Sequence, residues 1–467
     1  MHRIEETVAR GMCVGCGACS VATRGAIPVT IGRYGVMQAR LDGVAESDRR
    51  LGSAVCPFSD EAPNETELGV PDRSDSYAPQ DPHTGHYLQV LAGRVADDNY
   101  LLGSSSGGLT SWLLGELLGR GLVDGVVHVG RAEGDSLFGY RISHTIEQVR
   151  DARKSQYYSV TLAEVLATVR DSDKRYAIVG VPCFIKAARS LARTDASLKA
   201  NLRYYIGLVC GHLKSQFFAE SLAWQIGVSP DDLESVDFRI KNPARASVEY
   251  DFGALKAGDE QMRSAPTRTL VGGNWGHGAF QPEACNFCDD IFAETADIVF
   301  GDAWLPQYEK DWRGTNVVVN RNPELRDIFA EGVAAGAINL DALTLDDAAD
   351  SQGGNFRHRR QGLAVRLADD LDKGLSVPQK RVEPDLSVVP ARRRRLIRQR
   401  RVMSGRGTEA FVRAKKQADL RVYLSTMRTE VRRYRRIEGS LIRKIAIRVR
   451  KYSGMICRRV ARPGGNS

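Results

Sequence analysis

The sequence contains no uninterrupted apolar run of about 18 or more residues, so it offers no helix that could span a membrane. Its N-terminal stretch, MHRIEETVARGMCVGCGAC, has no apolar core of the kind that a secretory signal peptide carries. There is also no long internal repeat, which argues against a repeat architecture. These absences favour a globular chain that stays in the cytoplasm.

Acidic residues are scarce in one part of the chain only. Residues 391–467 contain 25 Lys and Arg but 4 Asp and Glu, which gives a net charge of +21. Because the whole chain carries +9, the other residues carry −12. With 467 residues, 42% of them hydrophobic, the chain has room for two or three domains. We therefore predict an acidic body followed by a strongly basic tail.

Cysteine is sparse but strongly grouped. Eight of the nine cysteines form two sets of four, and Cys457 is left over. Disulfides are the competing use of so many cysteines, but they belong to oxidising compartments and mostly to small secreted domains. In a large chain without an export signal, Cys-x-x-Cys spacing favours metal binding. Each set has the four thiolates that a [4Fe-4S] cluster requires.

The first set begins with three cysteines at successive x-x spacing. Cys13, Cys16 and Cys19 lie on one short loop, and Cys56, which Pro57 follows, supplies a distant fourth ligand. The glycines between the cysteines let the backbone fold closely around a cluster and point N–H groups at sulfur. A structural zinc site and unligated thiols are the alternatives. This spacing suits a cube better than a four-coordinate zinc ion.

The second set is spread over more than 100 residues. Cys183 and Cys210 each come at the end of a predicted strand, and Cys285 and Cys288 form a Cys-x-x-Cys pair. In a parallel sheet the carboxyl ends of the strands lie at one edge, where all four could meet. From spacing alone, the set stays open between a cluster, a zinc site and buried cysteines that act as small hydrophobic residues.

Strand and helix signals alternate from about residue 85. The predicted strands are 123–130, 176–183, 204–212, 296–302 and 315–320, and the predicted helices are 111–121, 162–170 and 184–192. This alternation indicates an α/β body with a largely parallel sheet. Polar stretches rich in proline at 67–84 and 375–390 are typical of linkers. We predict three units: a small ferredoxin-like [4Fe-4S] unit at 1–66, an α/β (α+β) body with a mixed or parallel sheet at 85–370, and a basic helical tail at 391–467.

A glycine–serine loop, which runs from Gly103 to Gly108, precedes a predicted helix. Unpaired N–H groups at a helix N-terminus suit a phosphate or pyrophosphate, although this loop is neither a GxGxxG fingerprint nor a Walker A loop. A plain turn with a serine cap explains it equally well. A second polar stretch, 153–158, contains Lys154, which could pair with a phosphate, and Tyr157, which could stack on a ring. A solvated loop is the simpler interpretation of this stretch.

Several motifs occur together in a distinctive order: CVGCGAC with CP, SSSGGLTSWLLGELLGRGLVDGVV, RKSQYYSV, AIVGVPCFIKAARSL, GLVCGH, CNFCDDIFAETADIVFGDAW and GTNVVV. This order resembles the family of beta subunits of coenzyme F420 hydrogenases and dehydrogenases, and the resemblance covers roughly residues 8–345. It implies FAD and one or more [4Fe-4S] clusters, of which we expect two. It also implies that Cys183, Cys210, Cys285 and Cys288 are the ligands of a cluster near the flavin.

The resemblance further implies which residues contact the flavin or the substrate. These contacts are carried over to two segments and fall on Ser106, Gly107, Gly108, Thr110, Lys154, Ser155 and Tyr157. Gly301 and Asp302 match the Gly-Asp element of the family. His212, in its Cys-Gly-His element, and Lys154 are candidates for acid–base catalysis. A structural histidine that caps a strand end is an equally good interpretation of His212.

Together these features predict an oxidoreductase. A hydride-carrying coenzyme, most simply coenzyme F420, passes two electrons at once, a cluster accepts one, and a flavin mediates between them. We expect electrons to pass between coenzyme F420, FAD, the 183/210/285/288 cluster, the 13/16/19/56 cluster, and an electron-carrier protein or partner subunit. The alternative is a ferredoxin-driven flavin reductase of an organic substrate, a lipid or glycan precursor, at the membrane surface. A third hypothesis is a non-catalytic adaptor with structural metals.

The basic tail has helical periodicity. Arginines and lysines separate apolar residues that recur at spacings of 3 or 4, and these are Val431, Tyr434, Ile437, Leu441, Ile442, Ile445 and Val449. A basic amphipathic helix favours an acidic partner or an anionic membrane surface, here the inner face of the membrane. Nucleic acid is a weaker candidate, because no aromatic platform or recognised nucleic-acid fold accompanies the charge. A helix packed on the body with a solvated charged face is the remaining alternative.

Overall fold

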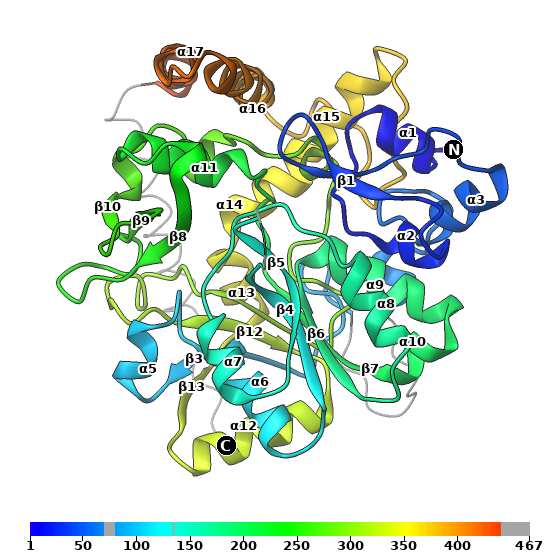
Figure 1. Ribbon diagram of the computed structural model, residues 1–467, viewed down its shortest axis with the longest axis vertical. Coiled ribbons are helices and arrows are strands. Elements are labelled where there is room, and N and C mark those ends of the chain that lie inside the picture. The colour runs from blue at the N-terminus through cyan, green and yellow to red at the C-terminus, as the bar shows by residue number, and fades with distance from the viewer. Residues whose placement is uncertain (70–79, 133, 135, 440–467) are drawn as a thin grey trace.

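The computed structural model describes residues 1–69, 80–132, 134 and 136–439. These residues form a small N-terminal unit, a body around an eight-stranded sheet, a three-stranded sheet beside it and a C-terminal helical hairpin (Figure 1). In this part of the chain, no helix combines the length and the apolar character that crossing a membrane requires. The predicted linker at 67–84 falls largely on residues 70–79, which lie outside the described residues.

The N-terminal unit consists of short helices and one hairpin. Its elements are α1 (Ile4–Ala9), α2 (Ala18–Ala22), the antiparallel strands β1 (Val29–Ile31) and β2 (Met37–Ala39), α3 (Glu46–Val55) and α4 (Glu65–Leu68). Its buried residues Ile4, Met12 and Ile27 belong to the same hydrophobic core as one face of the large sheet. The unit is therefore packed on the body and shares its core.

The large sheet has the strand order β13-β3-β12-β11-β7-β6-β4-β5. Its strands are β3 (Gln89–Val95), β4 (Gly125–Arg131), β5 (Phe138–Ser143), β6 (Tyr176–Gly180), β7 (Leu202–Leu208), β11 (Ile298–Asp302), β12 (Asn316–Asn320) and β13 (Ile338–Ala342). The sheet is parallel at its centre, over β4, β6, β7 and β11, and antiparallel towards both edges. The prediction of a largely parallel sheet is thus correct for the centre only. β12 returns antiparallel to β11 because the connection between them contains no crossover helix.

Helices cover both faces of this sheet, as its alternating side chains require. Val126 and Ala177 face a core built with α6 (Leu109–Gly119), α7 (Ile146–Asp151) and α12 (Pro323–Ala334). The next residues, Val127 and Ile178, face the opposite core, built with α8 (Ala163–Arg170), α9 (Pro182–Thr194) and the N-terminal unit. The remaining helices of the body are α5 (Asp98–Leu102), α10 (Ala196–Asn201), α13 (Leu345–Ser351), α14 (Gly353–Phe356), η5 (Arg357–Gln361) and α15 (Gly362–Leu371).

A second, largely aromatic core lies under the small sheet. This sheet consists of β8 (Leu233–Ile240), β9 (Asp251–Lys256) and β10 (Arg263–Pro266), all antiparallel. It packs against α11 (Phe217–Gln225), which also contacts the short turn η1 (Pro230–Asp232). The turns η2 (Thr267–Thr269), η3 (Trp275–His277) and η4 (Glu283–Asn286) follow β10 along the chain, where η3 contacts α16 and η4 contacts α15. Phe218, Phe238 and Phe252 are buried there.

The tail contributes to the same core. α16 (Ala391–Gln417) and α17 (Arg421–Glu438) form an antiparallel hairpin in which Arg406 pairs with Glu430. Tyr423, Met427 and Tyr434 of α17 are buried against the body, and Val431 and Ile437 pack beside them. Over these residues the apolar face of the predicted amphipathic helix is therefore covered by the protein itself. Leu441, Ile442, Ile445 and Val449 lie outside the described residues, so the membrane-surface prediction stays a prediction.

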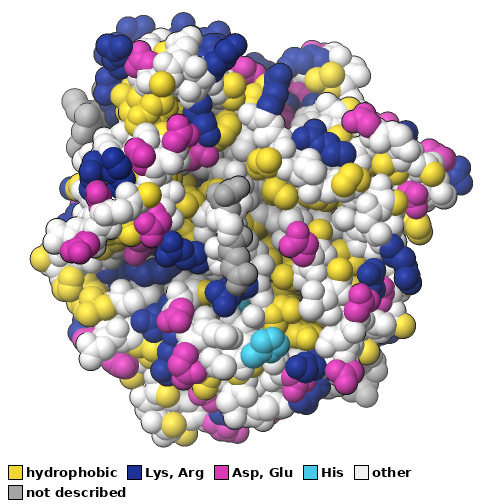
Figure 2. All heavy atoms as spheres, viewed as in Figure 1, with side chains coloured by type: hydrophobic (Ala, Val, Ile, Leu, Met, Phe, Trp, Pro, Cys, Tyr) yellow, Lys and Arg dark blue, Asp and Glu magenta, His cyan; other side chains and the backbone are white. Residues whose placement is uncertain are grey.

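The outer side of the hairpin is strongly basic. Figure 2 shows Lys and Arg side chains gathered at the top of the molecule, over α16 and α17. The exposed cations include Arg413, Lys416, Arg428, Arg432 and Arg436. The segment 375–390 that leads into the hairpin has no helix or strand, as its prolines predicted. It is tied to the body, however, because Arg381 pairs with the buried carboxylates of Asp289 and Glu294.

Candidate functional site

The four cysteines of the first set come together. Cys13, Cys16 and Cys19 lie in and before α2, Cys56 follows α3, and all four line one narrow cavity. Burial raises the pKa of each thiol, and the neighbouring cysteines raise the pKa of Cys16 and Cys19 further. This mutual effect shows that the sulfurs are close enough for their thiolates to repel one another.

Glycine is required twice in the loop that carries this set. Gly15 and Gly17 have φ angles of +68° and +87°, which L-residues with a side chain rarely adopt. A Cβ atom on Gly15 would fall 2.3 Å from the Cβ of Met37, and one on Gly17 would fall 2.6 Å from the backbone N of Ala163. The two glycines therefore let the loop pack against β2 and α8.

The second set also converges, although its members come from separate elements. Cys183 lies in the first turn of α9, Cys210 follows β7, and Cys285 and Cys288 lie in and just after η4. Burial raises the pKa of Cys183, and Cys288, Cys210 and Cys285 raise it further. The meeting point is the sheet edge formed by the carboxyl ends of β6 and β7, where the strand positions predicted it.

The distances between the thiols of each set decide whether the set suits a single metal ion or a cluster. Among the residues that the structure describes, no three His, Cys, Asp or Glu side chains are grouped so that they could hold one metal ion. A cubane differs from a single ion in this respect, because each of its four thiolates binds a different iron and the sulfurs lie further apart than around one ion.

The two cysteine sets are neighbours. Cys16 contributes to the raised pKa of Cys183, and both cysteines contribute to the raised pKa of Tyr140, after the larger effect of burial. The hydroxyl of Tyr140 donates a hydrogen bond to the carbonyl of Val179 at 3.1 Å, and its ring stacks on Phe184. Tyr140 thus lies beside both sets, and it also lines the large cavity.

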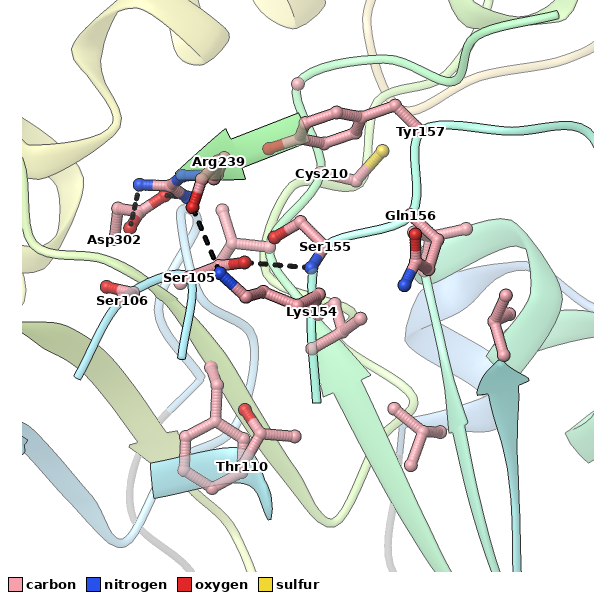
Figure 3. A pocket seen from close by; sticks show the side chains of 18 of the residues that line it. Ser105, Ser106, Thr110, Lys154, Ser155, Gln156, Tyr157, Cys210, Arg239 and Asp302 are labelled. Carbon is pink, nitrogen blue, oxygen red and sulfur yellow. Dashed lines mark hydrogen bonds and ion pairs between the residues drawn. The ribbon is translucent and has the colours of Figure 1, made fainter. Parts of the chain in front are cut away.

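A cavity of about 580 Å³ opens above the carboxyl ends of the parallel strands. Its volume is within the usual range for small-molecule and cofactor sites. Its walls hold residues from most of the motifs singled out in the sequence, and Figure 3 shows several of them. They include Ser106, Gly108, Thr110, Lys154, Ser155, Tyr157, Cys210, His212, Gly301 and Asp302.

The glycine–serine loop and the 153–158 stretch, remote in sequence, meet at this cavity. The backbone N–H of Ser155 donates to the Ser105 hydroxyl at 2.8 Å (Figure 3). Gly108, with φ +74°, precedes the first turn of α6. A Cβ atom on Gly107 would fall 2.6 Å from the carbonyl O of Gly93, so the loop lies directly on β3. The N-terminus of α6 therefore faces the cavity with a polar loop around it.

Comparison with known proteins relates this chain to a family. Residues 173–346 match the model of the C-terminal part of the coenzyme F420 hydrogenase/dehydrogenase beta subunit, and residues 90–167 match the model of its N-terminal part. The chain belongs to the family of coenzyme F420 hydrogenase/dehydrogenase beta subunits. It is accordingly an oxidoreductase of the type that is linked to coenzyme F420.

Individual relatives within this family are distant. One relative belongs to the F(420)H(2) dehydrogenase of Methanosarcina mazei and is 23% identical over 317 residues, which are 65% of this chain and 79% of that relative. A chain of the F420-reducing [NiFe] hydrogenase complex from Methanosarcina barkeri is 18% identical, with a TM-score of 0.48. That similarity covers 62% of this chain and 96% of the other.

The family match covers the second cysteine set and most of the cavity. Cys183, Cys210, Cys285 and Cys288 lie within residues 173–346, and the glycine–serine loop lies within 90–167. The first cysteine set precedes the match. The residues from 347 onwards, which include α14 to α17, follow it. The first cysteine set and the residues from 347 onwards thus lie outside the residues that the family models match.

An ion pair that the sequence did not indicate forms one wall of the cavity. The guanidinium of Arg239 donates to both carboxylate oxygens of Asp302, at 2.8 and 3.1 Å. Lys154 lies nearby, paired with Asp237 at 3.0 Å and donating to the carbonyl of Arg239 at 3.3 Å. The Lys154 ammonium is therefore held in place at the cavity rather than free in a solvated loop.

His212 lines the same cavity, two residues after Cys210. Its ring stacks on Trp275 with centroids 4.4 Å apart, and its Nε2 atom is buried without a hydrogen-bond partner among the described residues. Burial holds its pKa well below the usual value, with the nearby Lys214 contributing, so the ring is neutral. The Nζ of Lys214 donates to the carbonyl of Ala279 at 2.6 Å.

Tyr157 borders the cavity from within an aromatic cluster. Its ring is packed among aromatic residues, 4.8 Å from the Trp275 centroid and 5.3 Å from that of Phe238. Burial raises the pKa of its hydroxyl. The ring borders the cavity as part of its aromatic wall, so its stacking on a bound ring stays a prediction.

Sequence reasoning missed Arg239, Lys214, Trp275 and Arg359, all of which are buried or half-buried at this site. Each is a single residue without a recurring pattern around it. The only signal was the position of Arg239 between the apolar residues Phe238 and Ile240, where a charged side chain requires a buried partner. That signal names no partner, because Asp302 lies 63 residues further along the chain.

Proposed function

We propose that this chain is an iron–sulfur flavoprotein that passes electrons between coenzyme F420 and a one-electron carrier protein or partner subunit. The observation that supports this most is that the large cavity, the second cysteine set and the first cysteine set lie next to one another in that order. The large cavity contains Cys210 of the second cysteine set in its wall, and the second set neighbours the first through Cys183, Tyr140 and Cys16. A two-electron site and one-electron sites are thus adjacent.

The residues at the glycine–serine end of the cavity fit the pyrophosphate of FAD. The N-terminus of α6 faces the cavity beside Gly108, whose φ of +74° lets the chain turn into the helix. Thr110 and Ser155 add polar atoms to the same wall, and Lys154 adds a fixed positive charge. We propose that these residues, with Ser106 and Tyr157, hold the cofactor.

The eight grouped cysteines fit two [4Fe-4S] clusters. Each set offers four thiols in a buried pocket, and burial raises the pKa of every one of them. A thiolate is disfavoured in such surroundings unless a bound metal neutralises it, so iron would supply the charge that these pockets require. We propose Cys13, Cys16, Cys19 and Cys56 as one ligand set and Cys183, Cys210, Cys285 and Cys288 as the other.

The chemistry that a flavin supplies here is the exchange of a hydride for single electrons. The chain itself holds the reactants and excludes water. His212 offers a neutral ring with an unpartnered Nε2 at the cavity wall, suited to form a hydrogen bond with a bound ligand. Lys154, fixed by Asp237, is suited to orient a negatively charged group of the cofactor or substrate.

Purification without oxygen tests the proposal. We expect yellow-brown protein with flavin absorbance and about eight irons per chain. The flavin absorbance should bleach when reduced coenzyme F420 is added and should not bleach with NADH. Bleaching by reduced ferredoxin alone would favour the flavin reductase of an organic substrate instead. Protein with zinc and without flavin would contradict both redox functions and favour the adaptor.

A further inference from the structure

Arginines from the C-terminal part of the chain surround the loop that carries Cys285 and Cys288. The family match ends at residue 346, and the arginines all lie beyond it. Four of them contact residues 283–290. They are Arg359 of η5, Arg366 of α15, Arg381 of the irregular segment 375–390 and Arg401 of α16. This chain thus closes the second cysteine set with residues outside the family match.

Three of these arginines hold the backbone or carboxylates of the loop. Arg366 donates to the carbonyl of Asn286 at 2.7 Å. Arg381 donates to the carboxylate of Asp289 at 3.2 Å, and Arg401 donates to that of Glu283. These contacts end on oxygen atoms, so holding the loop accounts for all three.

Arg359 differs because its guanidinium reaches the cysteines themselves. One Nη donates to the Sγ of Cys288 and to the carbonyl of Asp290, the latter at 2.8 Å. The other side of the guanidinium donates to the carbonyl of Gly211, next to Cys210, at 3.0 Å. The side chain is only 1% exposed. Arg359 therefore links the two halves of the second set from within.

The charges around Arg359 are mostly those of the cysteines. Although burial opposes its charge, the pKa of Arg359 is raised by Cys288, Cys210 and Cys285, in that order, and then by Asp290. The Arg359 guanidinium therefore interacts chiefly with the charge on the thiolates of the second set and on any metal that they bind.

We propose that Arg359 sets the reduction potential of the cluster held by Cys183, Cys210, Cys285 and Cys288. This inference rests on the proposed function, which assigns a cluster to those residues. Reduction adds one electron to the cluster and no proton to the arginine, which stays charged throughout. A buried cation that also donates to a ligand sulfur stabilises the more negative, reduced form, and net charge and hydrogen bonds to sulfur are the known determinants of cluster potentials.

The proposal makes Arg359 a positioning and tuning residue, since it contacts a ligand sulfur rather than the substrate. Its consequence is that the residues after 346 influence the direction of electron flow. A higher potential at the second set favours electrons leaving the cavity side for that set. A chain that lacked the cation would hold the same cysteines at a lower potential.

The test is a redox titration of the full-length protein, in which low-temperature electron paramagnetic resonance measures the reduced clusters. The variants Arg359→Met and Arg359→Gln remove the charge, and Arg360→Gln, in the same turn, is the matched control. Arg360 donates to the carbonyl of Pro82 and pairs with Glu294 at 4.0 Å, and it is not among the largest charge effects on the cysteines of the second set. We expect two one-electron waves in the unmodified protein and a lower midpoint for one of them in the neutral variants.

The expected drop changes the ratio of reduced to oxidised cluster at least tenfold at a fixed ambient potential, which corresponds to 59 mV for one electron. The other wave, and both waves of Arg360→Gln, should stay in place. An unchanged midpoint in a neutral variant with full iron content would overturn the proposal. If both neutral variants lose four irons, Arg359→Lys decides. This variant keeps the positive charge, so its midpoint should stay close to that of the unmodified protein, and a drop as large as 59 mV with full iron content would overturn the charge effect.

Failure of the underlying function is a separate outcome. It would appear in the unmodified protein, as iron for fewer than two clusters or as a single wave. The effect of Arg359 is measured only against that baseline, so the two results cannot be confused.

Discussion

Arg239 on β8 and Asp302 on β11 join the small sheet to the large one through a two-fold hydrogen-bonded ion pair. The guanidinium is buried and the carboxylate borders the cavity, so the pair both fixes the position of one sheet on the other and shapes the wall between them.

Replacing Asp302 should damage both roles of this pair. Asp302→Asn leaves the Arg239 charge buried without its partner, and we expect a loss of about 2 kcal/mol in the free energy of unfolding, because the carboxylate side is partly exposed. Flavin content should fall as well. Chemical denaturation and flavin absorbance measure the two effects. Asp251→Asn breaks a similar pair, Arg245–Asp251, next to the small sheet, and it should leave flavin content unchanged.

Gly107 should be indispensable for cofactor binding. Gly107→Ala places a Cβ atom 2.6 Å from the carbonyl O of Gly93 and 2.8 Å from the backbone N of Asn316, so the loop must move off β3. We expect purified protein with little flavin. Gly115→Ala, in the helix that follows, meets only Ile146 at 3.6 Å and should keep the flavin. It should also gain about 0.5–1 kcal/mol of stability. Full flavin in Gly107→Ala would contradict the proposed cradle.

The two cysteine sets should lose iron independently. Cys16→Ser and Cys210→Ser should each reduce the iron content from about eight to about four per chain, since each removes one of four ligands of one cluster. Iron analysis of anaerobically purified protein measures this. Cys457→Ser, at the one ungrouped cysteine, is the control and should retain all the iron. Retention of eight irons in Cys210→Ser would argue against the second ligand set.

His128 should make the fold sensitive to acid. It is buried on β4 with its Nε2 2.7 Å from the Ser143 hydroxyl, and burial lowers its pKa to about 4 from 6.5. The unfolded chain therefore binds a proton as the pH falls below 6.5 while the folded chain does not, so stability is lost between pH 6.5 and 4. This residue should account for about 3 kcal/mol of that loss.

The measurement for His128 compares the slope of stability against pH rather than stability itself. His128→Gln should lose less stability than the unmodified protein between pH 6.5 and 4, whatever its stability at neutral pH. His144→Gln, at an exposed histidine, should leave the slope as it was. Equal slopes for His128→Gln and the unmodified protein would contradict the burial effect.

Removing residues 440–467 tests whether this segment binds a membrane surface. If the apolar residues 441–449 attach the chain to an anionic surface, the chain ending at residue 439 should no longer sediment with anionic vesicles, whereas the full chain should. Neutral vesicles should bind neither, and added salt should weaken the binding of the full chain. Undiminished binding by the truncated chain would instead assign the attachment to the exposed arginines of α17.

The sequence predicted what depends on local pattern. The parallel strands at the centre of the sheet and the helices that follow them were recognisable from apolar runs, and the convergence of Cys183 and Cys210 followed from the ends of two such strands. β3, β5 and β13 were not predicted, because antiparallel strands outside the parallel centre depend on partners that apolar runs do not reveal. The small sheet was missed for the same reason.

Charge patterning left one question open. The apolar stripe of the tail was correctly recognised as helical as far as residue 438, but periodicity states only that one side of a helix is apolar, not what covers it. Tyr423, Met427 and Tyr434 are covered by the body. The roles of Arg239 and Arg359 could not have been assigned from sequence, because they depend on contacts with Asp302 and Cys288. These partners are 63 and 71 residues away along the chain.

The arrangement of Arg359, Arg366 and Arg381 has a consequence for how the protein matures. These side chains leave the ribosome after the cysteines whose pocket they seal. If the second set holds the proposed cluster, iron and sulfide would have to reach the pocket before the segment that carries the three arginines packs against it. Cluster insertion would then precede the final packing of residues 359–381.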